Sequence, residues 1–393
     1  MKKLLLLVLV LLLSISMVAM FSLTGCKTTT TTETAAAATT AAAETTAAAT
    51  TAVATTAAET TAAETTAADI LAGKAVDANG KPYLLGYEAN EVGSGWMSSS
   101  VGYAESIWKR MGGKFVSFVS GQDLAKELSQ MDDLLQLKPN AILLHASDSK
   151  AIAPAVTKVQ AAGIPVFALD MGVIGADPTA FVTMDQNTMG IACGNYIKDN
   201  FSADKPANIL VIAGSLKQDA AIIREGGFES VVKTLPYAKI SQIIDCNWTA
   251  EKGLNGVLDA FQRDPTINAI FTHSDLYDQA IVQGLKQVGK LSKVGEAGHV
   301  VVLGIDGAPD GVAQINAGYL DGSAENNALM DVAGSFCMIL GKLYGQEVPA
   351  KTMIPSQLIT IANVAECWGS LPAGKFDSWP WIPNDAAYKL PSR

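Results

Sequence analysis

The sequence predicts an α/β protein built from two doubly wound parallel sheets. Short, nearly continuous apolar segments alternate with longer segments of helical spacing over most of residues 82–345. Buried strands separated by helices are typical of parallel sheets covered on both faces. The alternation comes in two sets, and removing the first 77 residues still leaves roughly 320, which suits two domains better than one.

Each set contains four expected strands. The first set has strands at 82–89, 114–120, 141–146 and 165–170, with helices at 97–112, 123–137 and 149–162. The second set has strands at 207–214, 240–246, 269–275 and 300–306, with helices at 188–200, 217–234, 249–263 and 276–289. A last helix is expected at about 327–344.

The N-terminus has the layout of an export signal. Two lysines precede an apolar run from Leu4 to Phe21, and Leu-Thr-Gly-Cys follows, ending at Cys26. This ending resembles a bacterial lipobox, in which the cysteine is diacylated and becomes the new N-terminus. We therefore expect residues 1–26 to be a lipoprotein signal, with an uncleaved membrane anchor as the alternative. In both cases the rest of the chain lies outside the cytoplasm.

Residues 27–77 are expected to form a tether. From 27 to 68 the chain consists almost only of Thr, Ala and Glu, with Val53 as the one branched aliphatic residue. Such a segment cannot bury enough apolar surface to offset the entropy of ordering it. We expect a disordered spacer between a lipid on Cys26, which holds the protein at the membrane, and the folded domains.

Charge and cysteine content exclude several classes of protein. The net charge is −10 and the pI is about 4.9, which argues against a nucleic-acid partner. No CxxC or Cys/His cluster occurs, so no metal site is expected. An exported protein can form disulfides, and the sequence leaves open whether the four cysteines after Cys26 do so or are buried thiols: Cys193, Cys246, Cys337 and Cys367.

Candidate ligand-binding residues follow the expected strands, because parallel sheets bind ligands beyond the carboxyl ends of their strands. In the first set these residues are Trp96, His145 and Asp170; in the second they are Trp248, Ser274 and Asp306. Indole rings pack on the C–H face of a sugar, and carboxylates accept hydrogen bonds from its hydroxyls. The pattern favours a sugar-like ligand between two tryptophans.

Each candidate also has a purely structural interpretation. The tryptophans can be packing residues, and His145 can be a structural residue at a strand end. Asp170 and Asp306 can cap helices, as can Ser274 with its neighbour Asp275. Arg224 is interpreted as a structural partner of a neighbouring carboxylate.

Extended motifs in this order resemble the sugar-binding type I periplasmic binding proteins, including the ribose- and galactofuranose-binding proteins. The motifs are GSGW, QAAGIPVFALD, AAIIREGGF, CNWTAEKGL, THSDLYDQAIVQGLKQVG and VVLGIDGAPDGVAQINAGYLDGS. The resemblance implies two lobes joined by three hinge strands, with the ligand in the cleft between them. It also implies that Trp96 and Trp248 stack on the ligand, that Asp170 and Asp306 bind it, and that Asn326 or Asn327 adds a polar contact.

The sequence departs from that family at two positions where arginine is common. Met171 and Ile222 occupy them, which removes two rigid hydrogen-bond donors. A deoxy-sugar, a polyol or a small furanose-like molecule needs fewer donors than a common pentose or hexose.

The resemblance implies a lipid-anchored binding protein that delivers a sugar-like molecule to the permease of an ABC importer. The alternative is a ligand-binding module for a sensor kinase or chemoreceptor. No enzymatic activity is expected, since no GxxxxGK[ST] or GxSxG motif occurs. We also expect a monomer without cofactor. The N-terminal lobe is expected at 78–185 plus 326–355, and the C-terminal lobe with its tail at 186–325 plus 356–393.

Overall fold

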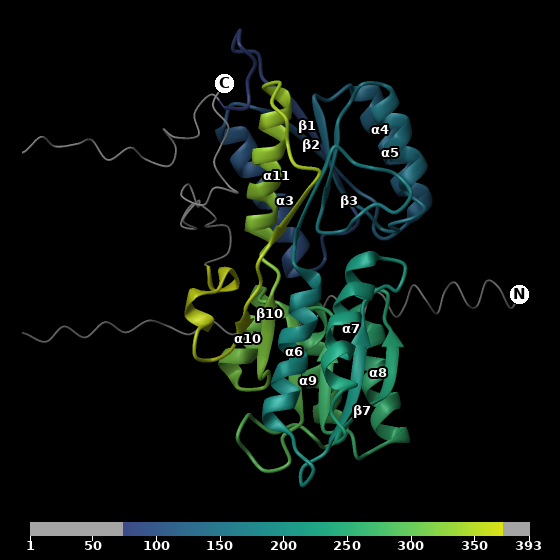
Figure 1. Cartoon of the computed structure of the whole chain (residues 1–393), viewed down its shortest axis with the longest axis vertical. Helices are drawn as coiled ribbons and strands as arrows, with labels where there is room; N and C mark the ends of the chain where they lie inside the picture. Colours follow the sequence, from purple (N-terminus) through teal and green to yellow (C-terminus); the bar gives the residue numbers. More distant parts are fainter. Residues whose placement is uncertain (1–73, 372–393) are drawn as a thin grey trace, which may run out of the picture. The chain divides into compact units, whose positions relative to one another are not determined.

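Two six-stranded sheets organise residues 74–371, the part of the chain that the computed structural model describes (Figure 1). The expected signal peptide, Cys26, most of the tether and the end of the tail lie outside these residues. The first sheet has the order β11 (Lys351–Ile354), β5 (Ala180–Met184), β4 (Val166–Leu169), β3 (Ala141–His145), β1 (Leu84–Ala89) and β2 (Lys114–Val119). The second has the order β12 (Leu358–Ile359), β10 (Gly322–Glu325), β9 (Val301–Asp306), β8 (Ala269–Thr272), β6 (Ala207–Ala213) and β7 (Ala238–Asp245).

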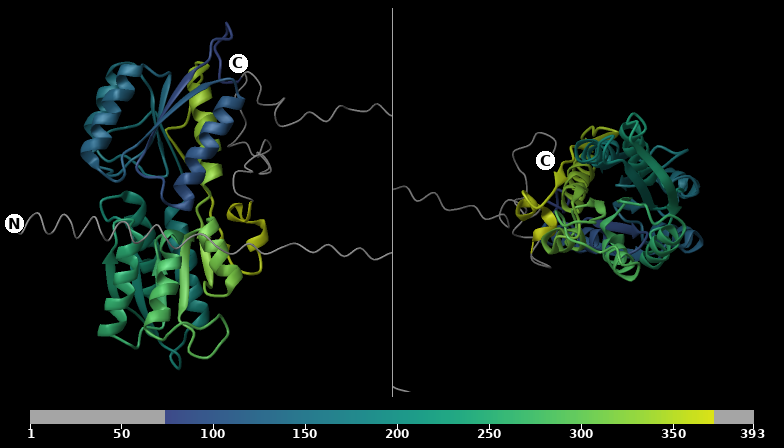
Figure 2. Two further views of the ribbon diagram at one scale, coloured as in Figure 1. Left: turned by 180° about the vertical axis from the view of Figure 1, so that it is seen from behind. Right: turned by 90° about the horizontal axis from the view of Figure 1, so that it is seen from below.

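Helices cover both faces of each sheet, and together they define two lobes (Figures 1 and 2). In the N-terminal lobe, α3 (Gly95–Arg110) packs with α11 (Ala328–Leu343), and α4 (Leu124–Leu137) packs with α5 (Ala153–Ala161) on the opposite face. In the C-terminal lobe, α6 (Gln186–Asn200) packs with α7 (Asp219–Val232). The remaining helices of this lobe form a second layer: α8 (Ala250–Arg263), α9 (Asp278–Gln287) and α10 (Pro309–Ala317).

The central strands are buried because their sequences are apolar on both faces. Every residue of β3 and of β6 is buried, whereas the edge strands β2 and β7 contain exposed positions. All pairings in the two sheets are parallel except that of β10 with β12. The prediction of two doubly wound parallel sheets is therefore confirmed.

Within the described residues the chain passes between the lobes three times. It leaves the N-terminal lobe after β5, returns to it after β10, and leaves again between β11 and β12. Side-chain caps mark the starts of the helices that follow the first two crossings. Asp185 accepts hydrogen bonds from the backbone N–H groups at the start of α6, and Asn327 does the same for α11.

Three short 3₁₀ helices and four cysteines also lie within residues 74–371. The 3₁₀ helices are η1 (Asp275–Tyr277), η2 (Val364–Glu366) and η3 (Trp368–Ser370). All four cysteines within residues 74–371 are buried. Cys193 and Cys367 are thiols that lie within hydrogen-bonding distance of backbone carbonyls, and Cys246 is also a free thiol. For these three the structure favours the buried-thiol alternative.

Candidate functional site

A pocket lined by aromatic and polar side chains lies between the two lobes, at the carboxyl ends of the strands of both sheets. Its cavity volume is about 40 Å³, enough for a few water-sized groups. Seven of the eight predicted ligand residues line it: Trp96, His145, Asp170, Trp248, Ser274, Asp306 and Asn326. The pocket is completed by Asn90, Glu91, Ser94, Met97, Gln122, Met171, Arg224 and Leu276.

The backbone at three of these residues is unusual. Asp170, Trp248 and Asp306 have φ values of 56°, 51° and 132°, a region that residues with a Cβ seldom adopt. Such conformations persist where the surrounding structure enforces them, and they concentrate at functional sites. Each of the three residues ends or follows a strand, so the turn directs the side chain into the pocket.

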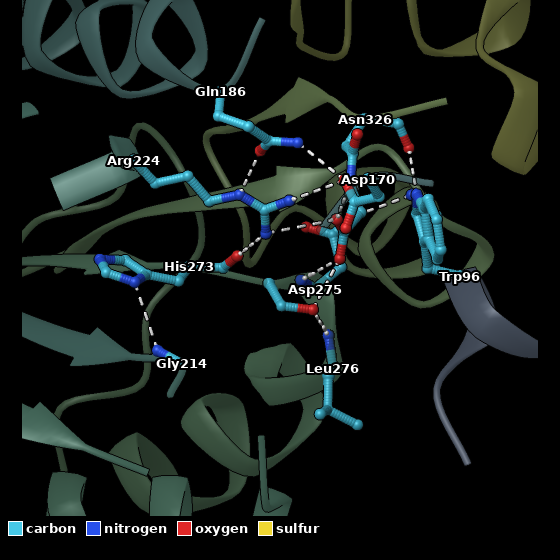
Figure 3. A network of polar contacts seen from close by, with 12 residues as sticks. Trp96, Asp170, Gln186, Gly214, Arg224, His273, Asp275, Leu276 and Asn326 are labelled. Atoms are coloured by element: carbon cyan, nitrogen blue, oxygen red, sulfur yellow. Dashed lines mark hydrogen bonds and ion pairs between the residues drawn. The ribbon is translucent and has the colours of Figure 1, made fainter. Parts of the chain in front are cut away.

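Arg224 is the central charge of the pocket (Figure 3). Its side chain is 2% exposed and lies 3.7 Å from Asp170 Oδ1 and 3.9 Å from Asp306 Oδ1. The guanidinium also donates a 2.6 Å hydrogen bond to Gln186 Oε1 and another of 2.6 Å to the backbone carbonyl of His273. The guanidinium therefore neutralises part of the charge of two buried carboxylates, one from each lobe.

Asp170 is held as a carboxylate by several donors. Gln186 Nε2 donates a 2.7 Å hydrogen bond and Asn326 Nδ2 one of 3.1 Å, and His145 Nε2 lies 3.2 Å away. Burial alone would raise the pKa of Asp170, but the hydrogen bond with His145 and the charge of Arg224 hold it below its ordinary value. Asp170 is therefore a strong acceptor in the pocket.

Asp306 has a different protonation equilibrium. Its carboxylate accepts a 2.6 Å hydrogen bond from Ser274 Oγ and one of 3.3 Å from the backbone N–H of Asp275. Burial raises the pKa of Asp306 to about 7, although Arg224 opposes the increase. The pKa values of the two aspartates are thus shifted in opposite directions: that of Asp170 is lowered and that of Asp306 is raised.

Three buried polar atoms of pocket residues have no hydrogen-bond partner among the described residues. They are Asn90 Oδ1, His145 Nδ1 and Asn326 Oδ1. A buried polar atom without a partner is costly and calls for an explanation. Groups of this kind in a pocket are available to a ligand that supplies the missing hydrogen bonds.

Both tryptophans are fixed in place. Trp96 donates a 2.7 Å hydrogen bond to the backbone carbonyl of Asn326, and its ring lies 5.4 Å from that of His145. Trp248 stacks on Tyr277 with a ring separation of 6.5 Å. Gly214 is required beneath the Trp248 ring, because a Cβ there would lie 2.2 Å from Trp248 Cη2.

Asn327 does not line the pocket. Its Oδ1 accepts hydrogen bonds from the backbone at Leu329 and Met330, which caps α11, and its Nδ2 lies 3.2 Å from Glu325 Oε1. Of the two candidate asparagines, only Asn326 has its side chain at the pocket.

The structure also places the remaining sequence candidates. Ser274 caps η1, since its Oγ accepts a 3.2 Å hydrogen bond from Leu276 N–H, and the same Oγ donates to Asp306. Its role in ligand binding stays a prediction. Met171 lines the pocket, whereas Ile222 is 52% exposed. The interpretation of Arg224 as a structural residue was incomplete: it pairs with carboxylates and also lines the pocket.

Among residues 74–371, no group of three or more His, Cys, Asp or Glu side chains is arranged to hold a metal ion. No helix in the same range is long and apolar enough to cross a membrane.

The fold and pocket define a binding protein with two α/β lobes. The sequence matches the family described as periplasmic binding protein domain over residues 85–340. The chain therefore belongs to this family of binding proteins, as the resemblance implied.

Similar proteins include a curated relative and two solved structures. The ribose import binding protein of Salmonella typhimurium is 28% identical over 253 residues, covering 64% of this chain and 81% of the relative. A Caulobacter myo-inositol binding protein has a TM-score of 0.68 at 19% identity, covering 74% of this chain and 97% of its own. A fructose-binding periplasmic domain of a hybrid two-component system has a TM-score of 0.64 at 20% identity, covering 72% of this chain and 92% of its own. At these identities the two structures show the shared fold alone.

Proposed function

We propose that this protein captures an uncharged sugar or polyol outside the cytoplasm and delivers it to the permease of an ABC importer. The observation that carries the proposal is the pocket itself. Trp96, Asp170 and His145 of one lobe face Trp248, Arg224 and Asp306 of the other. Aromatic rings combined with buried hydrogen-bonding groups suit a small polyhydroxylated molecule.

The charges of the pocket favour a ligand rich in hydroxyl donors over an anion. Its ionisable side chains include three carboxylates, of Glu91, Asp170 and Asp306, and one guanidinium, that of Arg224. The guanidinium already contacts both aspartates, so a sugar acid or sugar phosphate would meet uncompensated negative charge. Met171 supplies no donor where an arginine was expected, which supports a polyol, deoxy-sugar or small furanose-like molecule.

The relatives support this class of ligand. The names of the similar proteins mention ribose and myo-inositol. A cavity of about 40 Å³ is small for such molecules, so we infer that the lobes separate to admit the ligand. We further propose that a lipid on Cys26 anchors the protein, that residues 27–77 act as the tether, and that the protein is a monomer without cofactor.

The second candidate function is ligand sensing. A fructose-binding domain of a two-component system has the same fold, so a sensor kinase or chemoreceptor is an alternative partner. Co-purification with permease subunits would support the importer, whereas co-purification with a kinase would support the sensor.

A thermal-shift screen of the purified full-length protein tests the ligand class. Ligand binding to the folded state raises its apparent stability by mass action. We expect a clear rise in melting temperature with one or more of the pentoses, hexoses, deoxy-sugars or polyols. Sugar phosphates and sugar acids should give no shift. Shifts with amino acids or nucleosides only would contradict the proposed ligand class.

Removal of either tryptophan should weaken binding of a compound that gives a shift. Trp96→Ala and Trp248→Ala should each cost about 2 kcal/mol or more, the amount typical of a binding hot spot. Isothermal titration calorimetry measures this loss. Tyr319→Ala is the matched control, because this aromatic residue of the C-terminal lobe lies against Lys293 and does not line the pocket. If both tryptophan variants kept the wild-type affinity, the stacking role would be wrong.

A further inference from the structure

The N-terminal end of α7 contacts the other lobe directly (Figure 1). Gln218 precedes this helix and is fully buried, but its side chain does not cap the helix. Instead, Gln218 Nε2 donates a 2.7 Å hydrogen bond to the backbone carbonyl of Ala146 in the N-terminal lobe. Gln218 Oε1 accepts the indole N–H of Trp248. One amide thus connects a pocket tryptophan to the opposite lobe.

Asp219, the first residue of α7, makes a second connection. Its Oδ1 accepts a 3.0 Å hydrogen bond from the backbone N–H of Gly172 and one of 3.3 Å from Ser149 Oγ. The backbone N–H of Asp219 in turn donates to Ser149 Oγ at 3.3 Å. Gly172 and Ser149 belong to two different loops of the N-terminal lobe, so Asp219 ties both loops to α7.

The close approach depends on a missing side chain. A Cβ on Gly172 would lie 2.3 Å from Asp219 Oδ2, so only glycine allows the loop to reach the carboxylate. Ser149 is fully buried, which keeps this contact away from competing water.

These contacts are separate from the pocket. Neither Gln218 nor Asp219 lines it, and the same holds for their partners Ala146, Ser149 and Gly172. Every hydrogen bond of the set joins the two lobes, apart from the one between Gln218 and Trp248. Separation of the lobes therefore has to break them.

We infer that Gln218 and Asp219 form an interlobe latch that stabilises the closed arrangement independently of ligand contacts. The inference rests on the proposed function in one respect, namely that the lobes open to admit a ligand. The latch also acts on the pocket. The bond to Ala146 fixes the amide of Gln218, and this amide in turn orients Trp248. Gln218 and Asp219 are thus positioning residues.

The test measures the distance between the lobes in the full-length protein without added ligand. Spin labels are attached at Ser129→Cys on α4 and Gln287→Cys on α9, both exposed, in a Cys26→Ser background that removes another labelling site. Double electron–electron resonance then gives the populations of the short-distance, closed form and the long-distance, open form.

Two variants remove the latch in different ways. Asp219→Ala removes the bonds that the carboxylate accepts from Gly172 and Ser149 and leaves Trp248 untouched. Gln218→Met keeps the length of the side chain but removes both the bond to Ala146 and the bond from the Trp248 indole. Since a single net hydrogen bond changes an equilibrium severalfold, each variant should lower the ratio of closed to open form by about tenfold.

Matched controls remove similar interactions within one lobe. Asp132→Ala breaks an ion pair with Lys158 at 2.7 Å, and Gln160→Met breaks a 3.1 Å hydrogen bond to the carbonyl of Asp177. Both should leave the ratio unchanged. Melting temperatures identify any variant that fails to fold, and the other latch variant then decides the result.

The outcomes separate the latch from the proposed function. A loss of closed form in either folded latch variant, with unchanged controls, supports the latch even if no sugar or polyol binds. Unchanged distances in the folded latch variants, or a wild-type protein with no short-distance population, would overturn it. The thermal-shift screen with sugars and polyols is judged independently.

Discussion

Replacing Arg224 by methionine should lower the free energy of unfolding by about 3–5 kcal/mol, the cost of removing one partner from a buried ion pair. The guanidinium is 2% exposed and lies near both Asp170 and Asp306. Without it, Asp170 would be a buried carboxylate whose strongest positive neighbour is gone, and Gln186 would lose a 2.6 Å hydrogen bond. Urea unfolding at pH 7, followed by circular dichroism, measures the loss.

A charge-matched variant tests the physical reason. Arg224→Met combined with Asp170→Asn removes the cation and one buried anion together, so the double variant should be more stable than Arg224→Met alone. Arg263→Met is the matched control, because Arg263 is 70% exposed and lies 4.0 Å from Asp259 on the helix surface. An exposed pair contributes about 1 kcal/mol or less. Equal losses in Arg224→Met and Arg263→Met would refute the central role of Arg224.

Much of the fold could be predicted because burial follows the apolar pattern. All eight expected strands are present, including AILLH (β3) and ANILVIA (β6), in which every residue is buried. Four strands were not expected: β5, β10, β11 and β12. β5 (AFVTM) is an apolar segment that was missed, and the other three have at most four residues. β10 has the sequence GSAE and β12 has two residues, and neither resembles an isolated apolar run. The pairing of these short strands depends on neighbouring strands, which local sequence does not reveal.

The pocket residues that lie at the ends of apolar strands could be predicted from the sequence. His145, Asp170 and Asp306 were found because each ends or directly follows an apolar strand. Arg224 was underestimated because α7 offers carboxylates close in sequence, such as Glu225, with which an arginine can pair without entering a pocket. Arg224 is buried because α7 packs closely against α6. The two helices are so close at Gly190 and Gly227 that a Cβ at either position would clash with the backbone of the other helix. Asn326 and Asn327 were both candidates because the alignment of this stretch was uncertain by one residue. Asn326 lines the pocket, and its neighbour Asn327 caps α11.

The protein should be more stable at pH 5 than at pH 8. Burial, and then the neighbouring charge of Glu127, raise the pKa of Glu88 from 4.5 to about 9. Burial also raises the pKa of Glu127 to about 7 and that of Asp306 to about 7. Between pH 5 and pH 8 the folded protein therefore binds protons that the unfolded chain has already released, so the free energy of unfolding falls as the pH rises.

Glu88 contributes to this effect together with Asp275, Asp278 and Asp331, because burial also raises the pKa values of these three aspartates well above their ordinary value. Each unit of difference between the pKa values of the folded and unfolded states is worth about 1.4 kcal/mol, so a decrease of a few kcal/mol is expected. Asp170 acts in the opposite direction, but because its pKa lies below 3.8 its contribution is lost only in more acidic solution. Urea unfolding at pH 5, 6, 7 and 8 measures the dependence.

The variant Glu88→Gln measures how much Glu88 contributes to the pH dependence of stability. Both carboxyl oxygens of Glu88 are buried and have no hydrogen-bond partner within residues 74–371, so a neutral amide of the same shape should be tolerated. The variant should lose part of the pH dependence, because the other buried carboxyls remain, and should be more stable than wild type at pH 8. Glu251→Gln, at an exposed position of α8, should change neither. If wild-type stability rose from pH 5 to pH 8, Glu88 would be ionised in the folded protein, and a cation or water molecules would have to solvate it beside β1.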